Sequence, residues 1–380
     1  MVRLCPFLYI VLSFGVIHSA RAQDSLTFDG QLSTWLLINP TNELPIYAGT
    51  RYIPELNLYF PLKNNRMLDM EASVNIFGNL GFQPFDTAHG DGYLKPYRAW
   101  VRYSTSQMEI RMGLQKINFG SASMLRPLMW FDRIDPRDPL QLTDGVWGVL
   151  GRYYWLNNAN IWLWVLYGNE NLKGWESIPS RKDIPEFGGR IQLPLPKGET
   201  ALSYHKRIAE GTTLPDSALQ YDKIPENRFG LDTRWDAVVG LWVEASWSHF
   251  GKDIGALTNQ YLINLGMDYT FGIGNGLALK FEQLFASQDK QVMHFSNATT
   301  FSLASLSYPV GLFDNVSAIV YYDWTNSKIY SFINWQRQFN KISLYLMGYF
   351  NPKEYYIPTQ QEGQVLFTGN GLQIMMVFNH

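Results

Sequence analysis

The chain has a single cysteine among 380 residues, Cys5, which stands just before an N-terminal apolar run. One cysteine forms no intrachain disulfide, and removal of an N-terminal segment would leave no thiolate metal site and no cysteine nucleophile. Long apolar runs are missing too. Beyond that segment the longest clear run covers residues 161–167, far short of the roughly 20 residues of a membrane-spanning helix. No basic tract is present, so we expect no nucleic acid partner.

The N-terminus has the features of a secretory signal. A cation at Arg3, an apolar run over residues 7–17 and the sequence Ala20-Arg21-Ala22 before Gln23 match a signal peptide with an A-x-A cleavage site. The sequence thus predicts a signal over residues 1–22 and a single barrel domain over residues 23–380. Loss of two arginines leaves 29 basic against 33 acidic residues, which is a net charge of −4.

What the sequence does contain is a repeated alternation of apolar and polar residues. Between Leu68 and Ile76 every second side chain is apolar, and those between are carboxylate, hydroxyl or amide. Aromatic residues reach 15% of the chain and cluster near segment ends, as in the interfacial girdles of membrane barrels. The sequence therefore predicts an all-β fold: a transmembrane, antiparallel, up-and-down β-barrel.

Period two locates eighteen strands in the sequence. They cover residues 26–38, 51–60, 67–77, 93–103, 107–117, 145–155, 160–168, 187–195, 199–207, 228–235, 239–248, 259–271, 277–285, 300–308, 315–324, 329–336, 341–350 and 371–378. Odd-numbered connections are mostly long and even-numbered ones short, as expected when long loops face outward and short turns face the periplasm. Because the odd connection over residues 325–328 is short, a barrel of sixteen strands stays an open alternative.

The same parity identifies charged side chains that point into the lumen. The charges expected there are Asp69, Glu71, Arg190, Arg228, Asp232, Arg234, Glu244, Lys280 and Glu282, together with Arg98, Arg102, Glu109, Arg111 and Arg152. Acids and bases on neighbouring strands can pair along the wall, or they can set opposed fields across a pore. The alternative is that these pairs only fill and rigidify the lumen.

The third long connection, residues 118–144, is the most distinctive segment. Between residues 121 and 139 it combines seven large apolar residues with charged ones, and burial of each apolar side chain would gain roughly 1.5 to 3 kcal/mol. We therefore expect it to fold inward as a constriction, with its charges facing the Arg98, Arg102 and Arg111 side of the wall. The charges are Arg126, Asp132, Arg133, Asp135, Arg137 and Asp138. An external lid packed on neighbouring loops is the alternative.

Two short segments carry a resemblance. The stretch Gly113-Leu114-Gln115-Lys116-Ile117-Asn118-Phe119-Gly120 and the Asp-Pro-x-Asp-Pro stretch over residues 135–139 resemble large Gram-negative porin-like barrels, including the alginate-export type. The match covers some forty residues. It implies that the arginines and acids line a polar channel. Alginate exporters have a strongly basic channel, whereas the charges here are mixed in sign. The resemblance therefore does not imply that the solute is a polyanion.

Catalytic and metal motifs are absent from the sequence. The histidines have no metal-binding spacing, and neither a G-x-S-x-G nor a phosphate-binding loop occurs. We therefore predict no enzyme activity, no cofactor and no metal. The expected function is an outer-membrane channel for passive diffusion of small hydrophilic solutes, in contact with outer-membrane lipid and lipopolysaccharide and with external loops open to protein partners. The alternatives are a closed barrel serving an assembly or export complex and, third, an outer-membrane hydrolase using His205 or His249.

Overall fold

The structure is a computed structural model that describes residues 25–213, 221–296, 298–353 and 367–380. The expected signal over residues 1–22 lies outside these ranges, so its boundary stays a prediction. No helix in the described ranges is both long and apolar enough to cross a membrane.

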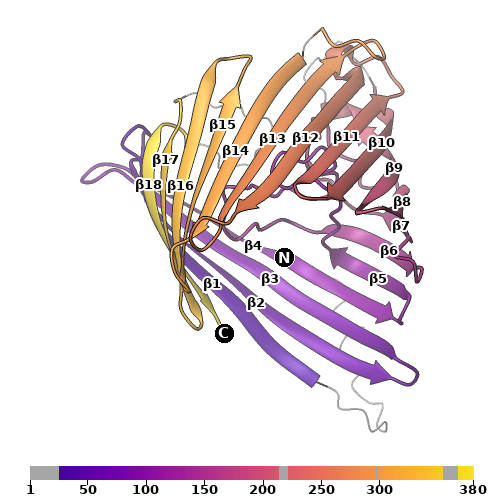
Figure 1. Ribbon diagram of the computed structural model, residues 1–380, viewed down its shortest axis with the longest axis horizontal. Coiled ribbons are helices and arrows are strands. Elements are labelled where there is room, and N and C mark those ends of the chain that lie inside the picture. Colours follow the sequence, from indigo (N-terminus) through magenta and orange to yellow (C-terminus); the bar gives the residue numbers. More distant parts are fainter. Residues whose placement is uncertain (1–24, 214–220, 297, 354–366) are drawn as a thin grey trace, which may run out of the picture.

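Eighteen antiparallel strands form the described fold (Figure 1). They are β1 (Ser25–Ile38), β2 (Ile46–Leu62), β3 (Arg66–Phe82), β4 (Ala88–Ser104), β5 (Met108–Gln115), β6 (Val146–Tyr154), β7 (Asn160–Leu166), β8 (Glu186–Leu195), β9 (Gly198–Glu210), β10 (Lys223–Asp236), β11 (Gly240–Phe250), β12 (Asn259–Phe271), β13 (Leu277–Asp289), β14 (Ala298–Pro309), β15 (Asp314–Asp323), β16 (Lys328–Gln338), β17 (Ile342–Phe350) and β18 (Asn370–Asn379). The predicted number of strands is confirmed.

Pairing between the first and last strands closes the sheet into a barrel. Each strand pairs with its sequence neighbour, and β1 pairs with β18 over Gln31 to Ile38. Closure leaves no sheet edge, so backbone N–H and C=O groups of the wall are hydrogen-bonded within the sheet. The predicted up-and-down barrel is confirmed.

The two faces of the wall have opposite chemistry. On β11 the side chains of Trp242, Glu244 and Ser246 are buried, while Leu241 on the opposite face of the same strand is 48% exposed. The same pattern holds around the barrel, where exposed apolar residues include Met112, Leu163, Leu202, Leu231 and Ile374. Apolar side chains outside and polar ones inside fit a barrel whose outer face meets hydrocarbon. The barrel wall is therefore built to span a lipid bilayer.

Connections at one end of the barrel are short and those at the other end are longer. The even-numbered connections have two to five residues, and the odd-numbered ones reach thirty residues between β5 and β6 and nineteen between β7 and β8. The short odd connection between β15 and β16 is a true hairpin over residues 324–327. That hairpin rules out the sixteen-strand alternative.

One predicted long loop is wrong. Residues 78–92 were expected to be a loop, but β3 and β4 continue to pair as far as Phe82 and Ala88, which leaves a turn of five residues. Glycines at positions 78, 81, 90 and 92 resemble a loop in composition. In the barrel, pairing of β3 with both β2 and β4 supplies the hydrogen bonds that hold this segment extended.

Candidate functional site

Loop 3, defined here as residues 116–145 between β5 and β6, contacts the inner face of distant strands. The backbone N–H groups of Ala122 and Leu128 donate to the two oxygens of the Glu244 carboxylate on β11, at 2.8 and 2.7 Å. Glu244 is fully buried. Buried polar oxygens without donors are costly, and loop 3 supplies one N–H donor to each oxygen of Glu244.

The carboxylate of Glu282 on β13 holds the next part of the loop. It accepts the N–H groups of Ser123, Met124 and Leu125 at 2.9, 3.1 and 2.6 Å. On β12 the side chain of Asn264 donates to the Leu125 carbonyl at 2.7 Å. Bonds to a charged acceptor are stronger than bonds between neutral groups. The middle of loop 3 is thus fixed to β11, β12 and β13.

The apolar residues of loop 3 are buried, as the sequence analysis expected. Leu128, Trp130 and Phe131 pack in one cluster with side chains of β6 and β7, including Leu150 and Trp164. In a second cluster, Leu125 joins side chains of β13 to β17. Its members from those strands are Leu284, Phe301, Leu303, Tyr321, Tyr330, Phe332 and Tyr349. Loop 3 therefore touches separate arcs of the inner wall.

The charges of loop 3 mostly pair within the loop, which differs from the expectation that they face the wall arginines. Arg126 pairs with Asp132 at 2.7 Å, and Arg137 pairs with Asp135 at 2.5 Å. Burial raises the pKa of Asp138, whose oxygens accept two loop N–H groups. Short sequence separation lets these partners meet, while the wall residues Glu244 and Glu282 also act on Arg126 through their charge.

Only the end of loop 3 reaches the β4 side of the barrel. Arg98 on β4 donates to the Thr143 carbonyl at 3.0 Å, and Lys95 pairs with Asp144 at 2.7 Å. Thr143 also accepts the N–H of Arg133 at 2.8 Å. The expected meeting of loop 3 with this wall is thus limited to its returning limb.

The remaining wall arginines gather around one acid near the short-connection end. Glu109 on β5 lies 3.0 Å from Arg111, 3.5 Å from Arg152 and 3.8 Å from Arg102. Arg102 also forms a bidentate pair with Asp69. Two tryptophan rings lie against these guanidinium groups, Trp100 and Trp162. These charges were predicted to face the lumen, with pairing along the wall as one of the expected outcomes. The gathering of three arginines around Glu109 was not predicted.

The other predicted lumen charges are spread along the wall. Arg190 and Asp232 form a buried pair, with Nη2 and Oδ2 at 2.8 Å, and Arg234 pairs with Asp268 at 3.1 Å. Glu71 accepts a long hydrogen bond of 3.4 Å from Ser73, and Lys280 is half-buried on the inner face of β13. These charges do not converge on one point.

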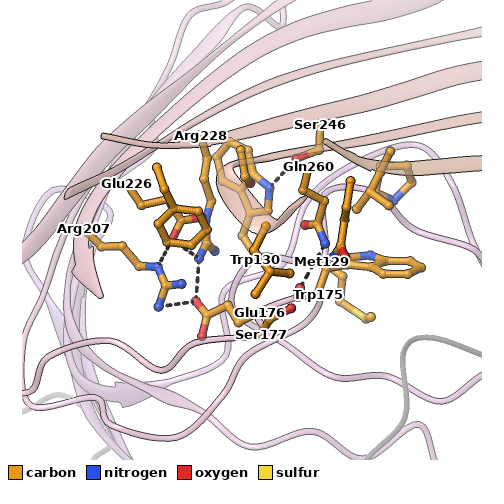
Figure 2. A pocket seen from close by; sticks show the side chains of 16 residues that line it. Met129, Trp130, Trp175, Glu176, Ser177, Arg207, Glu226, Arg228, Ser246 and Gln260 are labelled. Atoms are coloured by element: carbon orange, nitrogen blue, oxygen red, sulfur yellow. Dashed lines mark hydrogen bonds and ion pairs between the residues drawn. The ribbon is translucent and has the colours of Figure 1, made fainter. Parts of the chain in front are cut away.

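Loop 4, defined here as residues 167–185 between β7 and β8, carries an acid into a buried ion-pair network (Figure 2). Glu176 contacts Arg207 at 3.3 Å and Arg228 at 2.8 Å, and both arginines also pair with Glu226. All four side chains are at most 4% exposed. They border a cavity of about 20 Å³ between loops 3 and 4 and the inner wall, a space fit for about one water.

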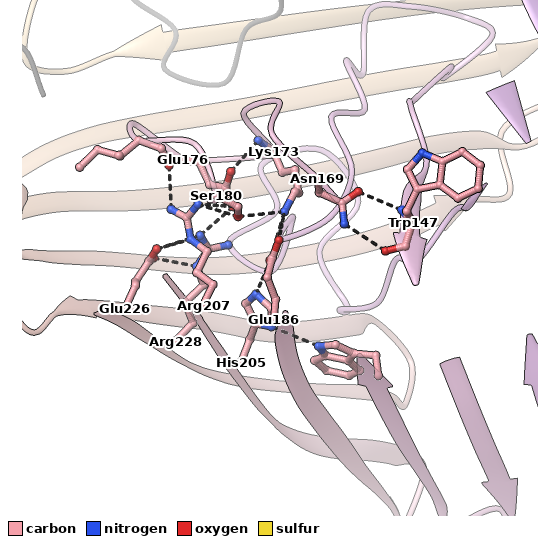
Figure 3. Close-up of polar contacts among 12 residues, drawn as sticks. Trp147, Asn169, Lys173, Glu176, Ser180, Glu186, His205, Arg207, Glu226 and Arg228 are labelled. Atoms are coloured by element: carbon pink, nitrogen blue, oxygen red, sulfur yellow. Dashed lines mark hydrogen bonds and ion pairs between the residues drawn. The ribbon is translucent and has the colours of Figure 1, made fainter. Parts of the chain in front are cut away.

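A second buried network ties loop 4 to β8 and β9 (Figure 3). Lys173 pairs with Glu186 at 2.9 Å, and Glu186 lies 3.1 Å from His205 Nε2. Trp164 donates its indole N–H to His205 Nδ1 at 3.2 Å. Because an indole is only a donor, Nδ1 must be the acceptor and Nε2 must carry the proton. His205 is therefore a neutral tautomer with both ring nitrogens in hydrogen bonds.

For the other histidine considered for catalysis, His249, the Nδ1 atom lies 2.8 Å from the Asn259 side-chain oxygen. Within the described ranges no group of three or more His, Cys, Asp and Glu side chains could hold a metal ion. Sequence reasoning missed Arg207 and Glu226. Parity could have identified Arg207, which lies two residues beyond His205 on the same face, whereas nothing in the sequence marks Glu176.

Several solved structures resemble the fold along most of its length. The anion-selective porin from Comamonas acidovorans has a TM-score of 0.51 at 10% identity, with 94% of this chain and 100% of that chain covered. OmpT, an outer membrane protein of Vibrio cholerae, has a TM-score of 0.52 at 11% identity, with 94% and 99% covered. OccAB1 of Acinetobacter baumannii has a TM-score of 0.57 at 8% identity, with 94% and 96% covered.

At these identities the likeness establishes the fold, a large antiparallel barrel. No protein-family model matches the chain, and no curated protein matches its sequence.

Proposed function

We propose that this chain is an integral outer-membrane channel that lets small hydrophilic solutes cross by passive diffusion. The observation that carries the proposal is the arrangement of the wall, which has apolar side chains on its outer face and charged side chains on its inner face. Leucines such as Leu241 and Leu163 are exposed on the outer face, while Glu244 and Glu282 lie on the inner face. Such a wall isolates a polar interior from lipid. The porin named in one similar structure supports the same function.

The two ends of the barrel suggest its orientation. In outer-membrane barrels the short turns face the periplasm and the long loops face outward. The end that carries loops 3 and 4 would then be external, and the arginine group around Glu109 would lie toward the periplasm.

Loop 3 is our candidate for the constriction. Its anchors on Glu244, Glu282 and Arg98 belong to well-separated strands of the wall, so the loop backbone would lie inside the barrel between them. The mechanism involves no covalent step and no enzyme activity. Selectivity would come from the width beside loop 3 and from the charges of Arg102, Glu109, Arg111 and Arg152 farther along.

The direct test is conductance of the purified full chain in a planar bilayer. We expect stable stepwise openings, and silence at all voltages would refute the channel.

A second experiment tests the constriction itself. Replacement of residues 124–135 by a short glycine and serine linker should raise the single-channel conductance, because the loop that fills the lumen becomes smaller. Arg181→Gln is a matched control, since Arg181 pairs with Asp222 in exposed loops. Unchanged conductance in the deletion variant would place the constriction elsewhere.

A further inference from the structure

Three aromatic rings from three strands stack on the inner wall. Phe77 on β3 stacks with Tyr93 on β4, with ring centroids 4.9 Å apart, and with Trp35 on β1 at 5.7 Å. The ring planes are within 26° of parallel. Ile76, the neighbour of Phe77, is 40% exposed on the outer face, so alternation turns Phe77 inward. The rings form an aromatic strip on the inner wall across β1, β3 and β4.

The strip depends on Gly49 of β2, which lies between β1 and β3. A Cβ at Gly49 would come within 2.2 Å of the Trp35 ring, so only glycine lets that ring cross β2 to reach Phe77. Gly49 pairs directly with Trp35 in the sheet. The missing side chain at Gly49 of β2 therefore lets the Trp35 ring of β1 contact the Phe77 ring of β3.

A cation without a carboxylate partner lies against this strip. The Arg51 guanidinium carbon is 5.2 Å from the Phe77 ring centroid and 5.9 Å from that of Trp35. No ion pair within 4.0 Å joins Arg51 to a carboxylate among the described residues, and its Nε is buried without a hydrogen-bond partner. The Asp138 carboxyl of loop 3 is its acidic neighbour at longer range, near enough for the charge of Arg51 to oppose the rise that burial causes in the pKa of that carboxyl. Other inner-wall arginines, such as Arg102 and Arg190, have paired acids.

Unused polar groups flank the strip as well. Asn75 and Asn79 stand two residues on either side of Phe77, on the same face of β3. Asn75 is only 4% exposed, and the side-chain oxygens of both asparagines have no partner among the described residues. Buried amides are normally hydrogen-bonded. These unsatisfied acceptors, beside a guanidinium without a close ion-pair partner, fit a ligand that brings hydroxyl groups and a negative charge.

The strip is accessible and is bordered by loop 3. Tyr93 is 38% exposed, and Trp35, Arg51 and Phe77 are half-buried. Leu140 in the returning limb of loop 3 packs in the same cluster as Trp35. The strip therefore lies along the edge of the constriction proposed above.

We propose that Trp35, Phe77, Tyr93 and Arg51 form a binding site for a hydroxylated ring solute that carries one carboxylate, as an acidic monosaccharide does. The apolar C–H face of the ring would lie against the aromatic strip, the carboxylate on Arg51 and the hydroxyl groups on Asn75 and Asn79. This site rests on the proposed channel only for its part in transport, since binding itself needs no open pore.

Titration calorimetry on the detergent-folded full chain tests the site with three probes. Glucuronate has ring and charge, glucose has the ring alone, and gluconate has the charge on an open chain. We expect glucuronate to bind about tenfold more tightly than either glucose or gluconate. Each of those probes lacks one interaction, the charge-assisted hydrogen bond or the stacked ring, and one such interaction contributes about tenfold in affinity. Equal binding of glucuronate and gluconate, or no heat with any probe, would overturn the site.

Variants separate the two parts of the site. Arg51→Gln should weaken glucuronate binding about tenfold and leave glucose unchanged, whereas Phe77→Leu, which retains apolar bulk, should weaken both sugars and spare gluconate. Arg337→Gln is the matched control, because Arg337 is 44% exposed and pairs with Asp314. An equal effect of Arg51→Gln and Arg337→Gln would contradict the proposal. Glucuronate binding without conductance would refute the channel and retain the site.

Discussion

Glu282 and Leu125 join strand β13 to the middle of loop 3: the Leu125 N–H donates to Glu282 Oε2 at 2.6 Å. The two residues are 157 positions apart in the chain. Together with the N–H groups of Ser123 and Met124, this contact gives a single wall carboxylate three successive backbone donors. Glu282 was predicted as a lumen charge, and the structure uses it as the anchor of a loop.

Removal of that anchor should release loop 3. Glu282→Ala leaves the N–H groups of residues 123–125 without an acceptor, at about 1 to 3 kcal/mol for each group that stays buried. We expect limited proteolysis of the folded barrel to cut within loop 3 in this variant and not in the parent. Glu282→Gln retains one acceptor and should be cut more slowly.

Glu199→Gln serves as the control, since the Glu199 carboxylate accepts a hydrogen bond from the exposed Gln192 side chain and lies far along the chain from loop 3. Resistance of loop 3 in Glu282→Ala would mean that its apolar clusters hold it without the carboxylate.

We expect the loss of one charge from the buried ion pairs of loop 4 to lower the stability of the barrel strongly. Glu226→Gln would leave Arg207 and Arg228 with Glu176 as their remaining acid. Breaking a buried pair typically costs about 3 to 5 kcal/mol, so the urea midpoint of barrel unfolding should fall markedly. Asp222→Asn removes an exposed partner of Arg181 and should shift it little. Similar shifts in both variants would show that the buried network adds no stability.

A glycine fixes the approach of loop 4 to loop 3. Gly174 has φ of +45°, and a Cβ there would stand 1.5 Å from the Met129 carbonyl oxygen. Gly255 has φ of +68° with open space around its Cβ position. Alanine at Gly255 should therefore cost only the backbone term, about 1 to 2 kcal/mol. Alanine at Gly174 should cost clearly more and should expose the loops to protease, so equal midpoints would rule out the close contact.

We expect the stability of the barrel to depend on pH through the buried carboxyl of Asp138. Burial raises the pKa of its carboxyl above the ordinary value of 3.8, so the folded barrel favours the protonated form. Its contribution to stability is complete below that value and is lost as the pH rises through the raised pKa. Asp138→Asn should gain stability relative to the parent between pH 3 and pH 7, measured by urea unfolding. A difference that does not change with pH would contradict this assignment.

The sequence predicted the barrel well because its determinants are local. Period-two alternation, as in Leu68 to Ile76, follows from strand geometry alone, and it placed Glu244 and Glu282 on the inner face. Strand ends were less well predicted: the extension of β3 to Phe82 depends on pairing with β2 and β4, which composition does not reveal.

The candidate site could be predicted only in part. The burial of the apolar residues of loop 3 was predicted correctly, because it follows from their chemistry. The partners of its charged residues were not predicted. Arg126 and Arg137 pair with acids inside the loop, and Glu282 of the wall accepts backbone N–H groups. The aromatic strip escaped prediction as well, since Trp35 and Phe77 meet only across the bare Gly49.

The sequence by itself determined the class of fold, an up-and-down barrel, and most of the side chains that face inward, because strand periodicity and the apolar solvent act on each segment separately. The choice between sixteen and eighteen strands needed the pairing of β15 with β16. Only the tertiary structure decided which inward groups meet. Contacts such as Glu282 with Leu125 or Trp35 with Phe77 depend on register, barrel curvature and the path of one loop across the interior. These are properties of the whole wall, and no single segment encodes them.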